Sequence, residues 1–231
     1  MNEFKIFLTR VLSISLITAI PCTLLLVLYF VTAPRIAEYH EIKLKKSVLN
    51  IFSIPYRTEE KKFFGLKFKK VDKKDVRNVF ENSITVETLP GQYNEQTEEG
   101  RKEKELFMYY KDEELQGIGF IATRLGYGFN KAADISLFIC VGPDLETVKG
   151  IEVLDHAETP GLGGRMTEEK FMKQFVGKKL KPKLSLVRGR KTIGPNEVHA
   201  ITGASFTSKG IENIINEAME TFWLEMEADK G

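Results

Sequence analysis

The longest apolar run of the chain lies near its N-terminus, where 24 residues without a charge separate Arg10 from Arg35. As an α-helix, a run of this length extends about 36 Å at 1.5 Å per residue, and the hydrocarbon core of a bilayer is about 30 Å thick. The pattern therefore predicts one transmembrane helix over about residues 11–34, within an N-terminal anchor of residues 1–35. A cleaved signal peptide is the alternative, although the apolar region of such a peptide is shorter.

A second hydrophobic pattern begins after residue 100, where short apolar runs are bounded by polar or glycine-containing turns. These runs predict strands and one further helix: strands at 106–111, 116–124, 133–141, 148–154 and 184–187, and a helix at 167–176. Helices do not alternate regularly with the strands, so a doubly wound sheet is not expected. The pattern predicts an α+β fold, with one mixed α/β domain over residues 101–231 and a largely antiparallel sheet.

The last periodic pattern starts at Thr207, from which apolar residues recur every three to four positions. They predict one buried stripe on a long helix: Ile211, Ile214, Ile215, Ala218, Met219, Phe222 and Met226. Thr207 and Ser208 would then lie near the helix N-terminus, where free backbone N–H groups and the helix dipole favour an anion such as phosphate. On this segment alone, an ordinary hydroxyl cap is the alternative.

Residues 36–100 separate the anchor from the predicted sheet and are rich in charge. Apolar residues at helical spacing occur over 42–52 and 76–80, and residues 91–100 are polar and acidic, as in an exposed loop. We therefore expect a membrane-proximal segment that is helical and polar.

Composition narrows the classes of partner and cofactor. A formal net charge of +2 gives no strong basic field for binding nucleic acid. Two cysteines and three histidines show no spacing typical of an iron–sulfur cluster or a zinc site, so we expect no metal. The sequence also has no Walker loop and no dinucleotide fingerprint after a strand, so we do not expect the chain to bind NADH by itself.

Two short motifs carry the candidate chemistry. The first follows the strand at 148–154, and its proline and glycines let the backbone approach a flat ligand closely: Glu158, Thr159, Pro160, Gly161, Leu162 and Gly163. The second combines small and hydroxylated residues at the start of the last helix: Thr202, Gly203, Ala204, Ser205, Phe206 and Thr207. Taken singly, the first could be an ordinary loop and the second an ordinary cap.

Together, in this order and behind one membrane span, the two motifs resemble the covalent FMN-binding domain. That domain occurs in the FMN-carrying subunit of the Na⁺-translocating NADH:quinone reductase and in its counterpart in the Rnf complex, and the resemblance covers about residues 117–231 and the span. It implies that Thr207 carries FMN through a phosphoester, and that the loop of residues 158–163 lies against the isoalloxazine ring. A glycine-rich turn at Gly126, Tyr127 and Gly128 would form another wall of the site, with a plain β-turn as the alternative.

The same resemblance implies a protein that relays electrons within a membrane complex. Its partners would be the other membrane subunits and, for maturation, a flavin transferase. The soluble domain would face the periplasmic or outer side of the bacterial inner membrane, which charge does not decide because basic residues flank both ends of the span. No side chain needs to act as an acid or base in such a relay, so we expect no catalytic residue. A stand-alone membrane-anchored flavoprotein reductase and a non-redox binding module are the alternatives.

Overall fold

The structure, a computed structural model, describes residues 2–63, 66–89, 104–125, 134–190 and 193–228. Contacts divide the chain into two compact units, residues 1–42 and residues 43–231. The domain division at residues 35 and 100 stays a prediction. The loop expected at residues 91–100 lies outside the described residues.

The first unit is helical. Helix α1 runs over Asn2–Ile51 and continues through Pro21 and Pro34. Its most apolar 18-residue window has a mean hydropathy of 2.5, and none of that window is buried inside the protein. Within the described ranges, α1 is the one helix long and apolar enough to cross a membrane. It contains the predicted span at residues 11–34.

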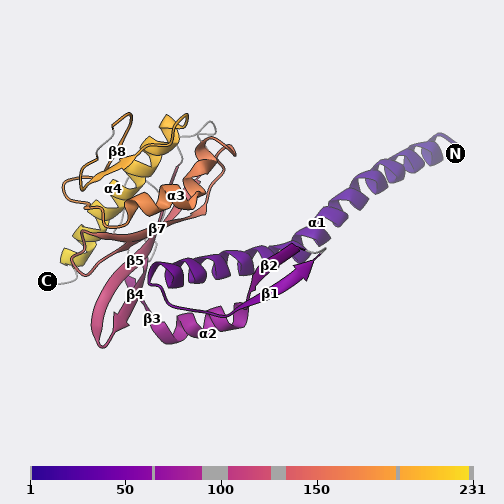
Figure 1. Ribbon diagram of the computed structural model, residues 1–231. Helices are drawn as coiled ribbons and strands as arrows, with labels where there is room; N and C mark the ends of the chain where they lie inside the picture. The colour runs from indigo at the N-terminus through magenta and orange to yellow at the C-terminus, as the bar shows by residue number, and fades with distance from the viewer. Residues whose placement is uncertain (1, 64–65, 90–103, 126–133, 191–192, 229–231) are drawn as a thin grey trace. The chain divides into compact units, whose positions relative to one another are not determined.

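The second unit is built on a five-stranded antiparallel sheet with the strand order β3-β4-β5-β6-β7 (Figure 1). Its strands are β3 (Ile84–Leu89), β4 (Lys104–Lys111), β5 (Glu114–Leu125), β6 (Asp134–Val141) and β7 (Val148–Asp155). Strands β4 and β5 form the hairpin expected around residues 112–114. These elements confirm the predicted α+β class and the antiparallel sheet.

Helices cover both faces of this sheet. On one face, α4 (Ser205–Ala228) stacks Phe222 on Phe120 of β5, with ring centroids 4.8 Å apart. On the opposite face, Phe80 of α2 (Lys73–Ser83) meets Phe107 of β4 at 6.1 Å. Strand β6 is buried on both sides, and for this reason its sequence is apolar at almost every position rather than at alternate ones. The buried stripe predicted for α4 is confirmed, except that Met226 is only partly buried.

The helix expected over residues 167–176 is wrong as a single element. The structure has three short turns there: η1 (Gly163–Thr167), α3 (Glu169–Met172) and η2 (Lys173–Phe175). A continuous helix would turn the side chain of Met166 about 140° away from that of Phe171 at 100° per residue. Extended Glu168 interrupts the helix, so that Met166 and Phe171 are both buried in the core.

Four strands have no counterpart in the sequence analysis. Strands β1 (Thr58–Phe63) and β2 (Leu66–Val71) form an antiparallel hairpin in the segment expected to be helical and polar, and β3 follows in the same segment. Strand β9 (Glu197–His199) pairs in parallel with β8 (Ser185–Val187), which corresponds to the strand expected at 184–187. Strand β1 carries charges in place of alternating apolar residues, so its pattern could not be separated from that of an exposed helix.

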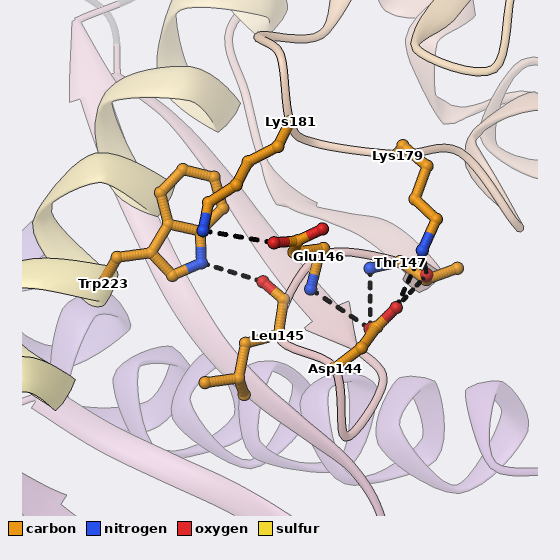
Figure 2. A network of polar contacts seen from close by, with 7 residues as sticks. All are labelled: Asp144, Leu145, Glu146, Thr147, Lys179, Lys181 and Trp223. Atoms are coloured by element: carbon orange, nitrogen blue, oxygen red, sulfur yellow. Dashed lines mark hydrogen bonds and ion pairs between the residues drawn. The ribbon is translucent and has the colours of Figure 1, made fainter.

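A polar network fixes the turn between β6 and β7 to α4, as Figure 2 shows. The indole N–H of Trp223 in α4 donates to the carbonyl oxygen of Leu145 at 2.8 Å. The ammonium group of Lys181 lies 4.5 Å above the Trp223 ring and 3.2 Å from the Glu146 carboxylate. The network holds α4 in place along the end of the sheet.

Candidate functional site

Helix α4 is docked by its own polar side chains onto β8. The Asn216 amide accepts a hydrogen bond from the Leu184 N–H and donates one to the Leu184 carbonyl, both at 2.9 Å. The Glu212 carboxylate accepts from the Leu186 N–H at 2.8 Å. Because these bonds fix the helix along its length, its first turn has a defined position in the domain.

The second motif forms the turn that leads into this helix. Gly203 has a φ of 83°, a left-handed conformation that other residues rarely adopt. The Ala204 N–H then donates to the Ile201 carbonyl, and the helix begins at Ser205. Within the described residues, no acceptor is recorded for the backbone N–H groups of Ser205, Phe206 and Thr207. This first turn therefore offers the free donors that an anion uses at a helix N-terminus.

The two adjacent hydroxyls of this turn have different partners. The Ser208 hydroxyl is buried, donates to the Ala204 carbonyl at 2.9 Å and accepts from the Ile201 N–H at 2.9 Å. Thr207 Oγ1 instead donates to Oε2 of Glu158 at 2.8 Å, across 49 residues of sequence. The structure thus assigns Ser208 to holding the turn, while the Thr207 hydroxyl faces the first motif.

Sequence reasoning placed Ser208 near the helix start but missed its structural role. Its spacing of four residues from Ala204 was the available signal, since serine and threonine in helices often bond back to the carbonyl four residues earlier.

The first motif folds as a tight turn. The Leu162 N–H donates to the Thr159 carbonyl at 3.2 Å, and Gly161 between them has a φ of 77°. Proline at the second position and a positive-φ glycine at the third are the residues that a type II turn requires. The Gly164 N–H also donates to the Thr159 carbonyl, at 3.0 Å, so the loop is closed on itself.

The structure brings the two motifs into direct contact. Besides the Glu158–Thr207 hydrogen bond, Gly163 lies against the Thr207 hydroxyl, since a Cβ added to Gly163 would be 2.6 Å from Thr207 Oγ1. Leu162 lies against Gly203, where an added Cβ would be 3.8 Å from Leu162 Cδ2. The contact could not be derived from spacing, because the two motifs are about forty residues apart.

Exposure differs sharply between the residues of the site. Thr207 is only 3% exposed, whereas Phe206 beside it in sequence is 74% exposed and Leu162 of the facing loop is 51% exposed. Two exposed apolar side chains next to a buried hydroxyl and free N–H groups fit a ligand with an apolar part and an anionic part.

The remaining predicted residues divide into two groups. Thr159, Pro160 and Gly161 form the turn, and Thr202 and Ser205 border the start of α4, so their roles toward a ligand stay predictions. Gly126, Tyr127 and Gly128 lie outside the described residues. The Nδ1 atom of His156 accepts a hydrogen bond from the Glu158 N–H at 3.1 Å, so this histidine supports the backbone at the start of the loop.

Comparison with known proteins agrees with this geometry. Residues 128–220, which include both motifs, match the FMN-binding domain. The NqrC subunit of the Na(+)-translocating NADH-quinone reductase from Yersinia pestis is 36% identical over 104 residues, which are 42% of this chain. The corresponding protein from Neisseria meningitidis serogroup B is 41% identical over 80 residues, which are 32% of this chain and 31% of that protein. The matched stretch spans 37% of the length of the Yersinia protein.

Solved structures show the same fold. NqrC of Shewanella oneidensis superposes with a TM-score of 0.63 at 19% identity, covering 80% of this chain and 97% of that one. The structure of the NqrC subunit from Parabacteroides distasonis gives a TM-score of 0.52 at 20% identity, covering 68% of this chain and 84% of that one. With the domain match and the curated relatives, the fold places the chain in the family of FMN-binding subunits to which NqrC of the Na(+)-translocating NADH-quinone reductase belongs.

Proposed function

We propose that the chain is a membrane-anchored electron carrier whose FMN is joined to Thr207 by a phosphoester. The observation that carries this proposal is the Thr207 hydroxyl at the start of α4, in direct contact with Glu158 of the facing loop. Neither motif would support it alone, because helix caps and glycine-containing turns are common. Their contact within one FMN-binding domain makes the two segments parts of a single site.

The residues present fit the phosphate end of such a cofactor. After esterification the phosphodiester keeps one negative charge, which the free N–H groups of Ser205, Phe206 and Thr207 and the helix dipole favour by about 0.3–1 kcal/mol in exposed cases. Ala204, at the helix start, has a short side chain, and Gly203 and Thr202 complete the turn around the phosphate.

The flavin ring is assigned to the loop of residues 158–163. Leu162 gives an exposed apolar contact, Thr159 gives a hydrogen-bonding group, and the turn at Pro160 and Gly161 keeps the backbone close. Gly126, Tyr127 and Gly128 are proposed as the remaining wall. FMN supplies one-electron transfer when it is bound, and the protein tunes its potential through hydrogen bonding and burial.

The place of this carrier in the cell follows from the anchor and the relatives. Helix α1 would cross the bacterial inner membrane once, with the soluble domain on the periplasmic or outer side. The partners would be the other membrane subunits of a redox complex of the Na⁺-translocating NADH:quinone reductase type, with the Rnf type as the second possibility. A flavin transferase would attach the cofactor.

Fluorescence of the denatured protein tests the attachment. The full chain is co-expressed with a flavin transferase, separated on a denaturing gel and illuminated with ultraviolet light, beside Thr207→Ala, Thr207→Ser and Ser205→Ala. We expect a fluorescent band in the parent, in Thr207→Ser and in Ser205→Ala, because each keeps a hydroxyl at position 207, and a dark band in Thr207→Ala.

Other results would change the function. A dark band in every lane would mean that the second motif is only a helix cap, in favour of a binding module. A bright parent that turns over rapidly with a soluble acceptor in the absence of partners would favour a stand-alone reductase. A bright Thr207→Ala band would move the attachment to another residue.

A further inference from the structure

We infer that Glu158 is the base that removes the proton of the Thr207 hydroxyl while the flavin phosphoester forms. The inference rests on the proposed attachment at Thr207. Its starting point is the hydrogen bond from Thr207 Oγ1 to Glu158 Oε2, whose length of 2.8 Å is within the range required of a general base. Glu158 therefore touches the atom that would react.

The partner of this hydroxyl is unusual for the chain. Other helical hydroxyls, of Thr9, Thr23, Ser208 and Thr221, donate to the carbonyl oxygen four residues earlier, which is the common pattern within a helix. Thr207 instead donates to a carboxylate from a different part of the chain. A carboxylate is a far stronger proton acceptor than a backbone carbonyl, so the contact is suited to deprotonating the hydroxyl.

The surroundings hold the two groups together. Gly163 packs directly against both the Glu158 carboxylate and Thr207 Oγ1, and its lack of a side chain leaves the space that they share. The Glu158 N–H is fixed on His156 Nδ1 at 3.1 Å. The neighbouring Ser208 hydroxyl is already used on both sides by the backbone. Among the described residues, Glu158 is the recorded partner of the Thr207 hydroxyl.

The reaction balances without oxidation or reduction. Thr207 Oγ1 forms a bond to the phosphorus of a flavin nucleotide, and the bond from that phosphorus to a leaving phosphate monoester breaks and takes its electron pair with it. The flavin donor must therefore be a phosphoanhydride, since expelling hydroxide from a simple phosphate is unfavourable. Glu158 takes the proton from Oγ1 and passes it to the leaving group or to water. A neutral threonine hydroxyl is a weak nucleophile, and a positioned base accelerates such a step by about 10²–10⁴-fold.

The same balance limits Glu158 to the unloaded protein. Once Oγ1 is an ester oxygen it has no proton to donate, so the hydrogen bond to Glu158 cannot persist. The new phosphodiester also carries a negative charge beside the carboxylate, and like charges at this distance repel. The Glu158 side chain must therefore leave Oγ1 after attachment.

A loading time course tests the inference. The purified full chain in detergent is mixed with a flavin transferase and FAD, whose anhydride joins the FMN phosphorus to AMP, and the fluorescence of denatured samples is followed with time. The variants are Glu158→Gln, Glu158→Asp and Thr207→Ala, and thermal unfolding shows that each is folded. Glutamine keeps the size and a hydrogen-bond acceptor but cannot take a proton.

We expect Glu158→Gln to lower the loading rate at saturating FAD by about 100-fold or more, and Glu158→Asp to recover part of that rate. In a Glu158→Ala variant, added formate should also accelerate loading, because a small carboxylate can occupy the vacated space. A merely positioning glutamate would instead leave Glu158→Gln close to the parent.

The outcomes separate this inference from the proposed function. Loading of the parent and not of Thr207→Ala supports the attachment site whatever Glu158 does. Glu158→Gln that loads at the parental rate, or that is slowed only through a raised KM for FAD, overturns the role of Glu158 as base. A parent that never loads overturns the proposed attachment and, with it, the inference.

Discussion

Gly163 lies so close to the Thr207 hydroxyl that a Cβ on Gly163 would be 2.6 Å from Oγ1. The same Cβ would collide with the carboxylate of Glu158. Gly163→Ala should therefore push both groups apart, at a cost of about 1–3 kcal/mol for overpacking. We expect covalent flavin to fall at least tenfold, measured as fluorescence of the denatured band per amount of folded protein.

Gly161→Ala is the matched control for this prediction. Gly161 has nothing within 4 Å of an added Cβ, but its φ of 77° is unfavourable for alanine by about 1–2 kcal/mol. This variant should lose a comparable amount of stability and keep most of its flavin. If the two variants loaded equally, crowding at Thr207 would not be the cause.

Ser208 should prove structural rather than chemical. Ser208→Ala removes a buried donor and acceptor and leaves the Ile201 N–H without its partner. We expect the free energy of unfolding to fall by about 1–3 kcal/mol, seen as a lower midpoint of thermal unfolding, while the folded fraction still carries covalent flavin. Ser205→Ala, which removes a hydroxyl with no recorded partner in the described chain, should change the midpoint little. Loss of flavin from folded Ser208→Ala would contradict the assignment.

The sequence predicted most of the fold where one period dominated. The stripe from Ile211 to Phe222 and the runs that became β4 to β7 were readable because helices and strands repeat at 3.6 and 2 residues. The break at Glu168 was not readable, because it exists to bury Met166 and Phe171 together, which is a tertiary requirement. The parallel pair β8–β9 was missed for a similar reason, since three residues are too few to show a period.

The candidate site was predictable in its parts but not in its geometry. Thr207 at a helix start and a tight glycine-containing turn at Gly161 followed from local chemistry. The hydrogen bond between Thr207 and Glu158 depends on how α4 is docked, and that is decided by side chains such as Asn216 and Glu212. No local pattern contains this information.

The ion pair between Lys104 and Glu225 should matter for stability. Its two atoms are 2.5 Å apart, the carboxylate is nearly fully buried, and the ammonium group also lies 5.2 Å from the centre of the Phe120 ring. Lys104→Met would leave a buried carboxylate without its cation, which costs about 3–5 kcal/mol. We expect a much lower unfolding midpoint, followed by the fluorescence of Trp223, the single tryptophan.

A second substitution separates the pair from its packing. Replacing both partners, as in Lys104→Met with Glu225→Leu, removes the unpaired charge, and such replacements are often neutral or stabilising. The double variant should therefore recover most of the stability lost by Lys104→Met. A double variant as unstable as the sum of the two single ones would mean that the two side chains act independently.

Asp144 should make the domain sensitive to acid. Burial alone would raise the pKa of this carboxyl, but hydrogen bonds from Thr147, Lys179 and Glu146 together hold its pKa far below the usual value. Because the folded pKa lies below the unfolded value of about 3.9, Asp144 stabilises the protein above that pH, and the contribution is lost as the pH falls through the folded pKa. The side chain is largely exposed, so solvent screening limits the effect to about 1 kcal/mol. Asp144→Asn should therefore unfold a few degrees below the parent at pH 7, and the difference should shrink progressively below about pH 4. Thermal unfolding of both proteins between pH 3 and pH 7 measures it, and a difference that stayed constant with pH would assign the loss to packing of the turn rather than to the charge.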